Sequence, residues 1–144
     1  MTSGPLPRFE YLDHTADILI RAYGVSLEEA IAHAGLALGA LMVGGESPEG
    51  DERESFTVES VDREGLVVAF LSRLIWEFDA EQRVGAEFSV SFEKPSQLKI
   101  NANWCRLDPA SLGAGVDVKG VSYHMMEMGR DEHGRDFVQV LVDV

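Results

Sequence analysis

Two carboxylates and an imidazole lie close together near the start of the sequence, at Asp13, His14 and Asp17. They stand at the entrance to a predicted strand over residues 17–23. Carboxylate oxygens suit Ca²⁺, Mg²⁺ or Mn²⁺, so this cluster is a candidate metal site. The same residue types also cap turns through side-chain to backbone hydrogen bonds. Spacing alone favours the turn, because metal sites recruit ligands from segments that are distant in sequence.

A second set of oxygen ligands lies at the other end of the sequence. Asp143 and the carboxylate of the last residue, Val144, follow a predicted strand over residues 137–142. If that strand lies beside residues 17–23, both carboxylates reach one edge of the sheet and add two oxygen ligands. A frayed and solvated terminus is the alternative. The residue pattern does not choose between them.

The long strand predicted over residues 117–128 holds further candidates. Lys119 is its single lysine, and it could reach a phosphate or a partner's carboxylate, or protect a sheet edge from aggregation. Three methionines follow on the same strand and indicate either an adaptable partner-binding surface or core packing, with core packing preferred. Cys105 has no cationic neighbour except Arg106, which favours a packed thiol over a nucleophile. The methionines are Met125, Met126 and Met128.

The charge balance narrows the classes of partner. Twelve Lys and Arg stand against 25 Asp and Glu, which gives a net charge of −13. Nucleic-acid-binding proteins neutralise phosphates with clustered basic residues. Because the basic residues here are few and scattered, we expect no direct RNA or DNA binding and no anionic membrane partner. An acidic surface suits a cation or a basic protein, or serves solubility alone.

Three features favour a cytoplasmic protein. Cys105 is the single cysteine, so no intramolecular disulfide can form, which fits a reducing compartment. No apolar run approaches the roughly 20 residues that span a bilayer. The first residues also lack the basic and apolar stretches of a secretory signal.

Capping residues and apolar periodicity predict two helices. Ser26 and Glu29 form a capping box, and apolar residues at helical spacing continue to Leu41. Gly44 is expected to end this first helix. Asp62 caps a second helix whose apolar positions run to residue 78.

The remaining segments alternate as strands and predict the fold class. Strands are expected over residues 17–23, 54–60, 87–93, 98–104, 117–128 and 137–142. The resulting order is β-α-β-α-β-β-β-β, which indicates an α+β fold. We predict a single two-layer domain over residues 1–144, with residues 1–8 as a loose leader. Its mixed or antiparallel sheet would carry both helices on one face.

Three stretches match motifs of a known family. Residues 9–17 read Phe-Glu-Tyr-Leu-Asp-His-Thr-Ala-Asp, followed by Gly24 and Ser-Leu-Glu-Glu-Ala at residues 26–30. Residues 118–124 read Val-Lys-Gly-Val-Ser-Tyr-His, and residues 141–144 read Leu-Val-Asp-Val. Together they resemble the archease family over nearly the whole chain. The resemblance implies a chaperone-like activator of the GTP- and metal-dependent RNA ligase that seals tRNA exon halves and repairs RNA. Such a protein promotes guanylylation and repeated turnover of the ligase and is not itself the catalyst.

The resemblance also assigns roles to individual residues. It implies a divalent-cation site formed by Asp17, Asp143 and Val144, with calcium as the expected ion and magnesium or manganese as alternatives. Asp13 belongs to the same acidic corner as a possible additional residue. Lys119 corresponds to the lysine implicated in ligase activation. The distant ligands at the chain end reverse the preference for a simple turn at residues 13–17.

One position departs from the family pattern. Val25 stands after Gly24, where relatives carry an acidic or small polar residue. We expect this position to border the acidic corner, so that the lost charge weakens metal or partner contacts.

Two functions of other classes stay open. A metal-dependent phosphoester hydrolase would use Asp13 and Asp17 as metal ligands and His14 as base. A general protein chaperone is supported by the acidity and by the methionines.

Overall fold

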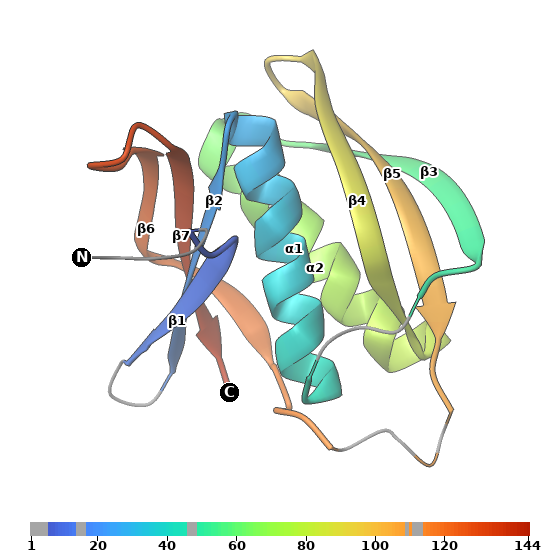
Figure 1. The fold of residues 1–144 in the computed structure, drawn as a ribbon. Helices are drawn as coiled ribbons and strands as arrows, with labels where there is room; N and C mark the ends of the chain where they lie inside the picture. The colour runs from blue at the N-terminus through green and yellow to red at the C-terminus, as the bar shows by residue number, and fades with distance from the viewer. Residues whose placement is uncertain (1–5, 14–16, 46–48, 109, 111–113) are drawn as a thin grey trace.

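Two helices lie between two β-sheets (Figure 1). The computed structural model describes residues 6–13, 17–45, 49–108, 110 and 114–144. Most of the expected leader, residues 1–5, therefore lies outside the described residues. In chain order the elements are β1 (Phe9–Asp13), β2 (Ile18–Gly24), α1 (Leu27–Val43), β3 (Glu52–Glu59), α2 (Arg63–Glu81), β4 (Arg83–Lys94), β5 (Gln97–Arg106), β6 (Gly120–Arg130) and β7 (Asp136–Asp143).

The first helix begins and ends at the residues that the sequence predicts. The hydroxyl of Ser26 accepts a hydrogen bond from the backbone N–H of Glu29 at 3.1 Å. The Glu29 carboxylate accepts from the backbone N–H of Val25 at 3.0 Å, one residue before the position that a standard capping box uses. Gly44 closes the helix with φ at 88°, a left-handed conformation that suits glycine.

The second helix is also capped as predicted. The Asp62 carboxylate accepts from the backbone N–H of Gly65 at 2.7 Å. A Cβ on Gly65 would lie 1.8 Å from the hydroxyl oxygen of Ser60, so a larger residue there would require the Ser60 side chain to move. Within the described ranges, no helix is long and apolar enough to cross a membrane.

The strands form two antiparallel sheets. The four-stranded sheet has the order β1-β2-β7-β6, and the three-stranded sheet has the order β3-β5-β4. The α+β class is confirmed, but the expectation of one sheet with both helices on one face is wrong. β1 is an additional strand, so the order is β-β-α-β-α-β-β-β-β.

The composition of α1 explains why sheets pack on two sides of the helices. Its buried residues surround the helix and are mostly small, as in Ala30, Ala34 and Ala37. A helix that is apolar all round is buried on all sides. Gly35 also lets α2 approach closely, because a Cβ there would lie 2.9 Å from the Phe70 ring.

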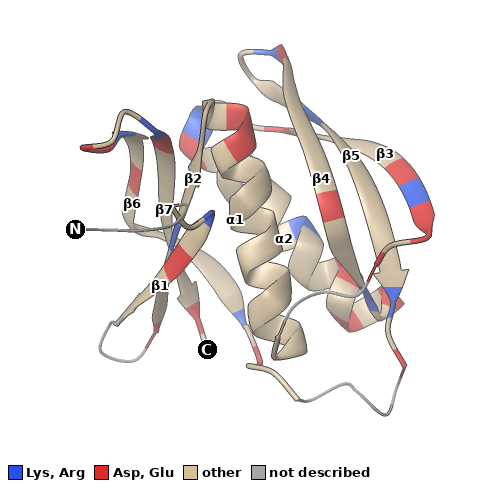
Figure 2. Ribbon diagram, viewed as in Figure 1, with Lys and Arg blue, Asp and Glu red and all other residues tan. Residues whose placement is uncertain are grey.

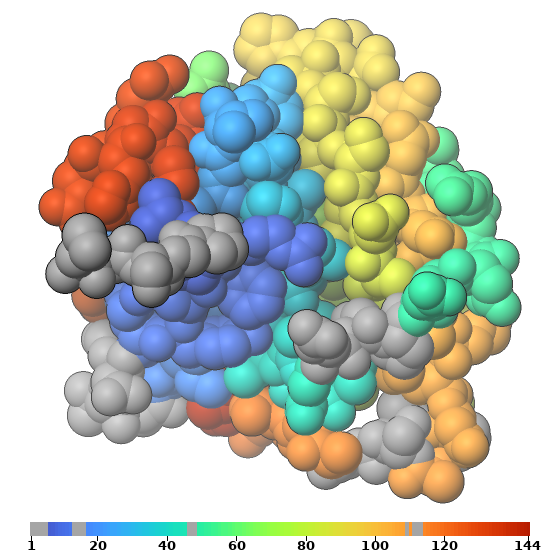
Figure 3. Space-filling view, in the orientation of Figure 1, coloured from blue at the N-terminus to red at the C-terminus, as the bar shows by residue number. Residues whose placement is uncertain are grey.

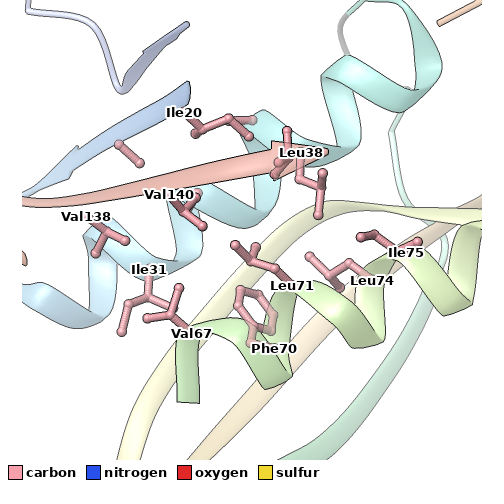
Figure 4. Packing of buried hydrophobic residues seen from close by; sticks show 14 of the residues in the cluster. Ile20, Ile31, Leu38, Val67, Phe70, Leu71, Leu74, Ile75, Val138 and Val140 are labelled. Atoms are coloured by element: carbon pink, nitrogen blue, oxygen red, sulfur yellow. The ribbon is translucent and has the colours of Figure 1, made fainter. Parts of the chain in front are cut away.

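The core fills the space between the sheets and both helices. Figure 4 shows α2 side chains such as Phe70 and Leu71 facing residues of α1 and of the four-stranded sheet. Strand β5 closes the other side with alternating buried side chains at Leu98, Ile100 and Trp104. This single apolar cluster holds the two sheets in a fixed relation.

An ionic network joins α2 to the three-stranded sheet. Glu77 is fully buried and accepts hydrogen bonds from Arg73 and Arg83, each at 2.9 Å. Arg83 also donates to Glu52 at 2.6 Å and Glu54 at 2.8 Å. Burial alone would raise the pKa of Glu77, but the hydrogen bonds and charges of the two arginines outweigh it and lower that pKa.

Candidate metal centre at the strand ends

Three strands of the four-stranded sheet bring acidic residues to one end of the sheet. β1 ends at Asp13, which pairs with Ile18. Ile18 in turn pairs with Val142, so Asp17 and Asp143 each stand one residue beyond this pair. We call Asp13, Asp17, Asp143 and Val144 the acidic corner. Figure 2 shows charged segments at the lower ends of these strands, close to the C-terminus.

The fourth strand adds a basic residue to the same end. Gly120, the first residue of β6, pairs with Asp143. The backbone N–H of the preceding residue, Lys119, donates a 2.8 Å hydrogen bond to the carbonyl oxygen of Asp143. The end of β7 and the segment before β6 meet at the lower margin of the molecule (Figure 3). The structure therefore brings Lys119 and the residues of the acidic corner together across about 100 positions of sequence.

The Asp143 side chain is open to solvent. Val142 is fully buried in the core, and the alternation of a strand directs the next side chain to the opposite face of the sheet. Asp143 is exposed there, and Gly120 across from it has no side chain to crowd the carboxylate. A Cβ on Gly120 would lie 3.8 Å from Oδ2 of Asp143. Asp17, at the start of the neighbouring strand, is half-buried.

The carboxylate oxygens of the acidic corner are of the ligand type that hard divalent cations bind. Carboxylate oxygens are the ligands that Ca²⁺ and Mg²⁺ prefer, and Ca²⁺ takes six to eight of them. Among the described residues, no three His, Cys, Asp or Glu side chains are grouped closely enough to hold a metal ion. The roles of Asp13, Asp17, Asp143 and Val144 as ligands stay a prediction.

Two glycines position the segment that leads to Lys119. Residues 114–116 pack against the C-terminal end of α1, where Val116 donates to the carbonyl oxygen of Leu41 at 3.0 Å. A Cβ on Gly115 would lie 2.2 Å from the carbonyl oxygen of Met42, and a Cβ on Gly44 would lie 2.7 Å from that of Ala114. These contacts fix where the chain turns toward β6.

An apolar recess lies beside this segment. It has a volume of about 530 Å³. Tyr11 borders the recess and donates from its hydroxyl to the carbonyl oxygen of Ala37 at 2.8 Å, which ties β1 to α1. Burial raises the pKa of this hydroxyl. Other lining residues are Phe9, Leu41, Gly44, Gly115 and Val116.

A polar groove of similar size lies between α1 and the three-stranded sheet, and its lining includes His33, Ser55 and Asn101. His33 is half-buried, as a boundary residue, and its Nδ1 lies 2.5 Å from the carbonyl oxygen of Tyr23. The Nδ1–H therefore donates to that carbonyl, which leaves Nε2 as an acceptor in the neutral ring.

Two further expectations concern individual residues. Cys105 is half-buried, and burial together with the negative charge of Asp51 raises the pKa of its thiol, which disfavours the reactive thiolate.

Val25 does not border the acidic corner, because the seven residues of β2 separate it from Asp17. That expectation was wrong, since the direction of β2 places Val25 at the opposite end of the sheet. His14, the base in the hydrolase reading, lies outside the described residues.

Comparison with known proteins decides the family. The family model described as the archease protein family matches residues 9–144. The archease of Pyrococcus abyssi is 36% identical over an alignment of 142 residues that covers 96% of this chain and 100% of that protein. The archease of Methanosarcina barkeri is 33% identical, over 95% of this chain and 96% of its own length. The chain belongs to the archease family.

Solved structures agree with the archease fold. The solution structure of Methanobacterium thermoautotrophicum protein 1598 is 30% identical and superposes with a TM-score of 0.74, over 95% of this chain and 99% of that one. The crystal structure of a Thermotoga maritima archease, described as a possible chaperone, has a TM-score of 0.58 over both full chains. At 17% identity the second likeness shows the fold alone.

Sequence reasoning missed two residues of this archease chain that hold backbone in place. Gly115 packs against the end of α1 beside the segment that leads to Lys119, and its backbone partner is distant in sequence. Gln139, which bonds to β6, is the one polar residue inside the apolar run of residues 137–142, and 8% of its surface is exposed. A polar residue inside a buried strand is the signal that could have identified it.

Proposed function

We propose that this chain activates a GTP- and metal-dependent RNA ligase that acts in tRNA splicing and RNA repair. In this role it promotes guanylylation and repeated turnover of the ligase, and the chemistry belongs to the ligase. Membership of the archease family supports the proposal. The observation in the structure that supports it most is the backbone hydrogen bond from Lys119 to Asp143 at the acidic corner.

In this proposal Asp17, Asp143 and the main-chain carboxylate of Val144 hold the divalent cation, with Asp13 nearby. Calcium is the expected ion, and magnesium or manganese could replace it. When bound, the cation offsets the repulsion between these carboxylates and orders the strand ends. The corner would then present one defined surface to the ligase.

Lys119 supplies positive charge at the edge of that surface. Its main chain lies one strand spacing, about 5 Å, from that of Asp143. Its side chain is exposed, and a lysine is a compact charge on a flexible stem. We place it against a phosphate of GTP or a carboxylate of the ligase, near the nucleotide pocket where the ligase histidine attacks GTP.

The net charge of −13 supports a protein partner over an RNA partner. An acidic protein approaches a basic surface faster and is repelled by phosphates. The ligase would therefore be recognised directly and not through its RNA substrate.

Ligase guanylylation with GTP and Mn²⁺, with and without this protein, tests the proposal. Asp17→Asn, Asp143→Asn and Lys119→Met should each weaken the activation by about tenfold to 100-fold, the range typical of lost metal-site partners. Asp79→Asn is the matched control, because Asp79 is exposed on α2, an element that contributes no residue to the corner. Unchanged activation by all three corner variants would refute the site. Suppressed aggregation of unrelated proteins, without effect on the ligase, would favour the general chaperone instead.

A further inference from the structure

Strand β6 carries a large irregularity a few residues after Lys119. Ser122 pairs with Leu141 and Glu127 pairs with Gln139. Four residues of β6, 123–126, therefore stand opposite the single residue Val140 of β7. We call residues 123–126 the β6 bulge. Bulges re-aim side chains and are frequent next to functional sites.

The backbone of the β6 bulge is strained at a non-glycine residue. Met125 has φ at 62°, in the left-handed region that L side chains rarely adopt. Gln82 is the other non-glycine residue with positive φ in the described part of the chain. Gln82 closes α2 and bonds its last carbonyl oxygens, so its strain has a structural reason. Met125 ends no helix.

A buried glutamine holds the bulge in this shape. Gln139 donates from its side-chain amide to the carbonyl oxygen of Met125 at 3.0 Å, and to the Glu127 carboxylate at 3.4 Å. One amide thus bonds to the bulge and to the residue that follows it. A polar side chain buried in a strand and committed to two such contacts indicates that this conformation is specified by the sequence.

The bulge divides the side chains of β6 between the core and solvent. Met126 and Met128 pack against the core cluster, as core packing predicts. Tyr123 and Met125 instead have 56% and 39% of their surface exposed. The β6 bulge therefore exposes an aromatic ring and a thioether to solvent, at the cost of a strained backbone.

We infer that the β6 bulge is a contact surface for the ligase. Tyr123 and Met125 insert into an apolar cleft of the ligase that is bordered by basic side chains. This inference rests on the proposed function. Tyrosine carries much of the binding energy at protein interfaces, and methionine adapts to a partner's shape. The basic border follows from charge complementarity with Glu127 and with the net charge of −13.

Continuity with the acidic corner identifies this partner. Tyr123 lies three residues beyond Gly120, a distance of about 10 Å along a strand. A standard interface covers about 800 Å² on each partner, so one partner that binds the corner also covers the bulge. β6 is the edge strand of its sheet, so its outer side faces no other described strand.

Binding of the purified ligase to the full chain, measured by biolayer interferometry, tests the inference. The double variant Tyr123→Ser, Met125→Ser should bind about tenfold or more weakly. Val61→Ser is the matched control, because Val61 is apolar and 98% exposed before α2; it should bind like the wild type. Wild-type affinity of the double variant would overturn the inference.

Met125→Gly separates contact from folding. Glycine adopts positive φ without strain, so this variant should melt at the same or a higher temperature while binding the ligase more weakly. A lower melting temperature with unchanged affinity would overturn the inference. So would a self-association that the double variant abolishes while ligase binding persists, because the surface would then serve a second copy of the chain.

The two proposals fail in different ways. Wild-type protein that binds the ligase without raising guanylylation would refute the proposed function, and the dependence of that binding on Tyr123 would still support the bulge. Wild-type protein that activates the ligase, with a double variant that binds and activates equally well, would refute the bulge alone. Absence of any binding to the ligase would refute both.

Discussion

The backbone N–H of Lys119 donates a 2.8 Å hydrogen bond to the carbonyl oxygen of Asp143. This bond joins the segment of Lys119, to which the archease resemblance assigns ligase activation, to the chain end to which it assigns the cation site, and it does so through the backbone. Side-chain substitutions at either residue should therefore leave the strand pairing in place. The corner can then be tested for function separately from folding.

Calcium should stabilise the wild-type protein through the acidic corner. A ligand that binds only the folded state raises the free energy of unfolding by about 2.7 kcal/mol at 100 times its dissociation constant. Thermal melts with added Ca²⁺, and with a chelator, should show this shift for the wild type and for Asp79→Asn. Asp17→Asn and Asp143→Asn should show little shift. An equal shift in Asp143→Asn would place the ion elsewhere.

Gly115→Ala should displace the segment that leads to Lys119. The new Cβ would meet the carbonyl oxygen of Met42 at 2.2 Å, against backbone that cannot move freely. We expect the free energy of unfolding to fall by about 1–3 kcal/mol, as for other overpacked sites, together with weaker ligase activation. Urea unfolding and the guanylylation rate measure these effects.

Gly45→Ala is the matched control for that substitution. No atom lies within 4 Å of a Cβ placed on Gly45, so its stability should change by no more than about 0.5 kcal/mol. Equal effects of the two alanines would show that Gly115 is not required by packing.

Glu77→Gln should destabilise the junction between α2 and the three-stranded sheet. The substitution removes the buried negative charge beside Arg83, itself 7% exposed, although Glu52 and Glu54 remain bonded to it. We expect a loss of about 3 kcal/mol, at the lower end of the range for broken buried pairs. Chemical denaturation measures it, with Glu93→Gln on the exposed face of β4 as control. If Glu77→Gln lowers the free energy of unfolding by less than the control does, the ionic network contributes nothing to stability.

Tyr23 should make stability fall at high pH. Burial, and then its 2.5 Å hydrogen bond to Glu10 and the charge of that carboxylate, raise the pKa of the hydroxyl from 10.0 to about 12. A folded-state pKa above the unfolded value stabilises the protein fully below pH 10.0 and progressively less as the pH rises toward 12. The two-unit difference corresponds to about 2–3 kcal/mol.

Unfolding free energies of wild type and Tyr23→Phe, compared from about pH 8 to about pH 12, test this linkage. The difference between them should shrink across that range. A constant difference would show that the hydroxyl titrates alike in the folded and unfolded chains.

Local signals predicted the helices well. Ser26 and Asp62 cap their helices through contacts within three residues, and Gly44 ends the first by its own conformational freedom. Such interactions are visible in sequence because they are short in range. β1 was missed because its last residue, Asp13, was interpreted as part of a ligand cluster at the entrance to the next strand. The second sheet was missed because strand pairing is set by packing on both sides of α1.

The candidate site needed long-range information. Asp17 and Asp143 become neighbours only through the register of β2 and β7, which no local pattern specifies. The resemblance supplied this pairing in advance, but it gave no hint of Gly115 or of the β6 bulge. The bulge depends on Gln139, whose partners lie on another strand. Val25 was misplaced for the same reason, because the direction of β2 decides at which end of the sheet Val25 lies, and no local pattern specifies that direction.

Guanylylation of the ligase from the same source, measured at substoichiometric amounts of this protein, shows whether the protein is a ligase activator. Wild-type protein should speed the first guanylylation and sustain repeated turnovers, and Asp143→Asn should do both about tenfold to 100-fold less effectively although it folds normally. Guanylylation at the same rate with and without the wild-type protein would contradict the activator role.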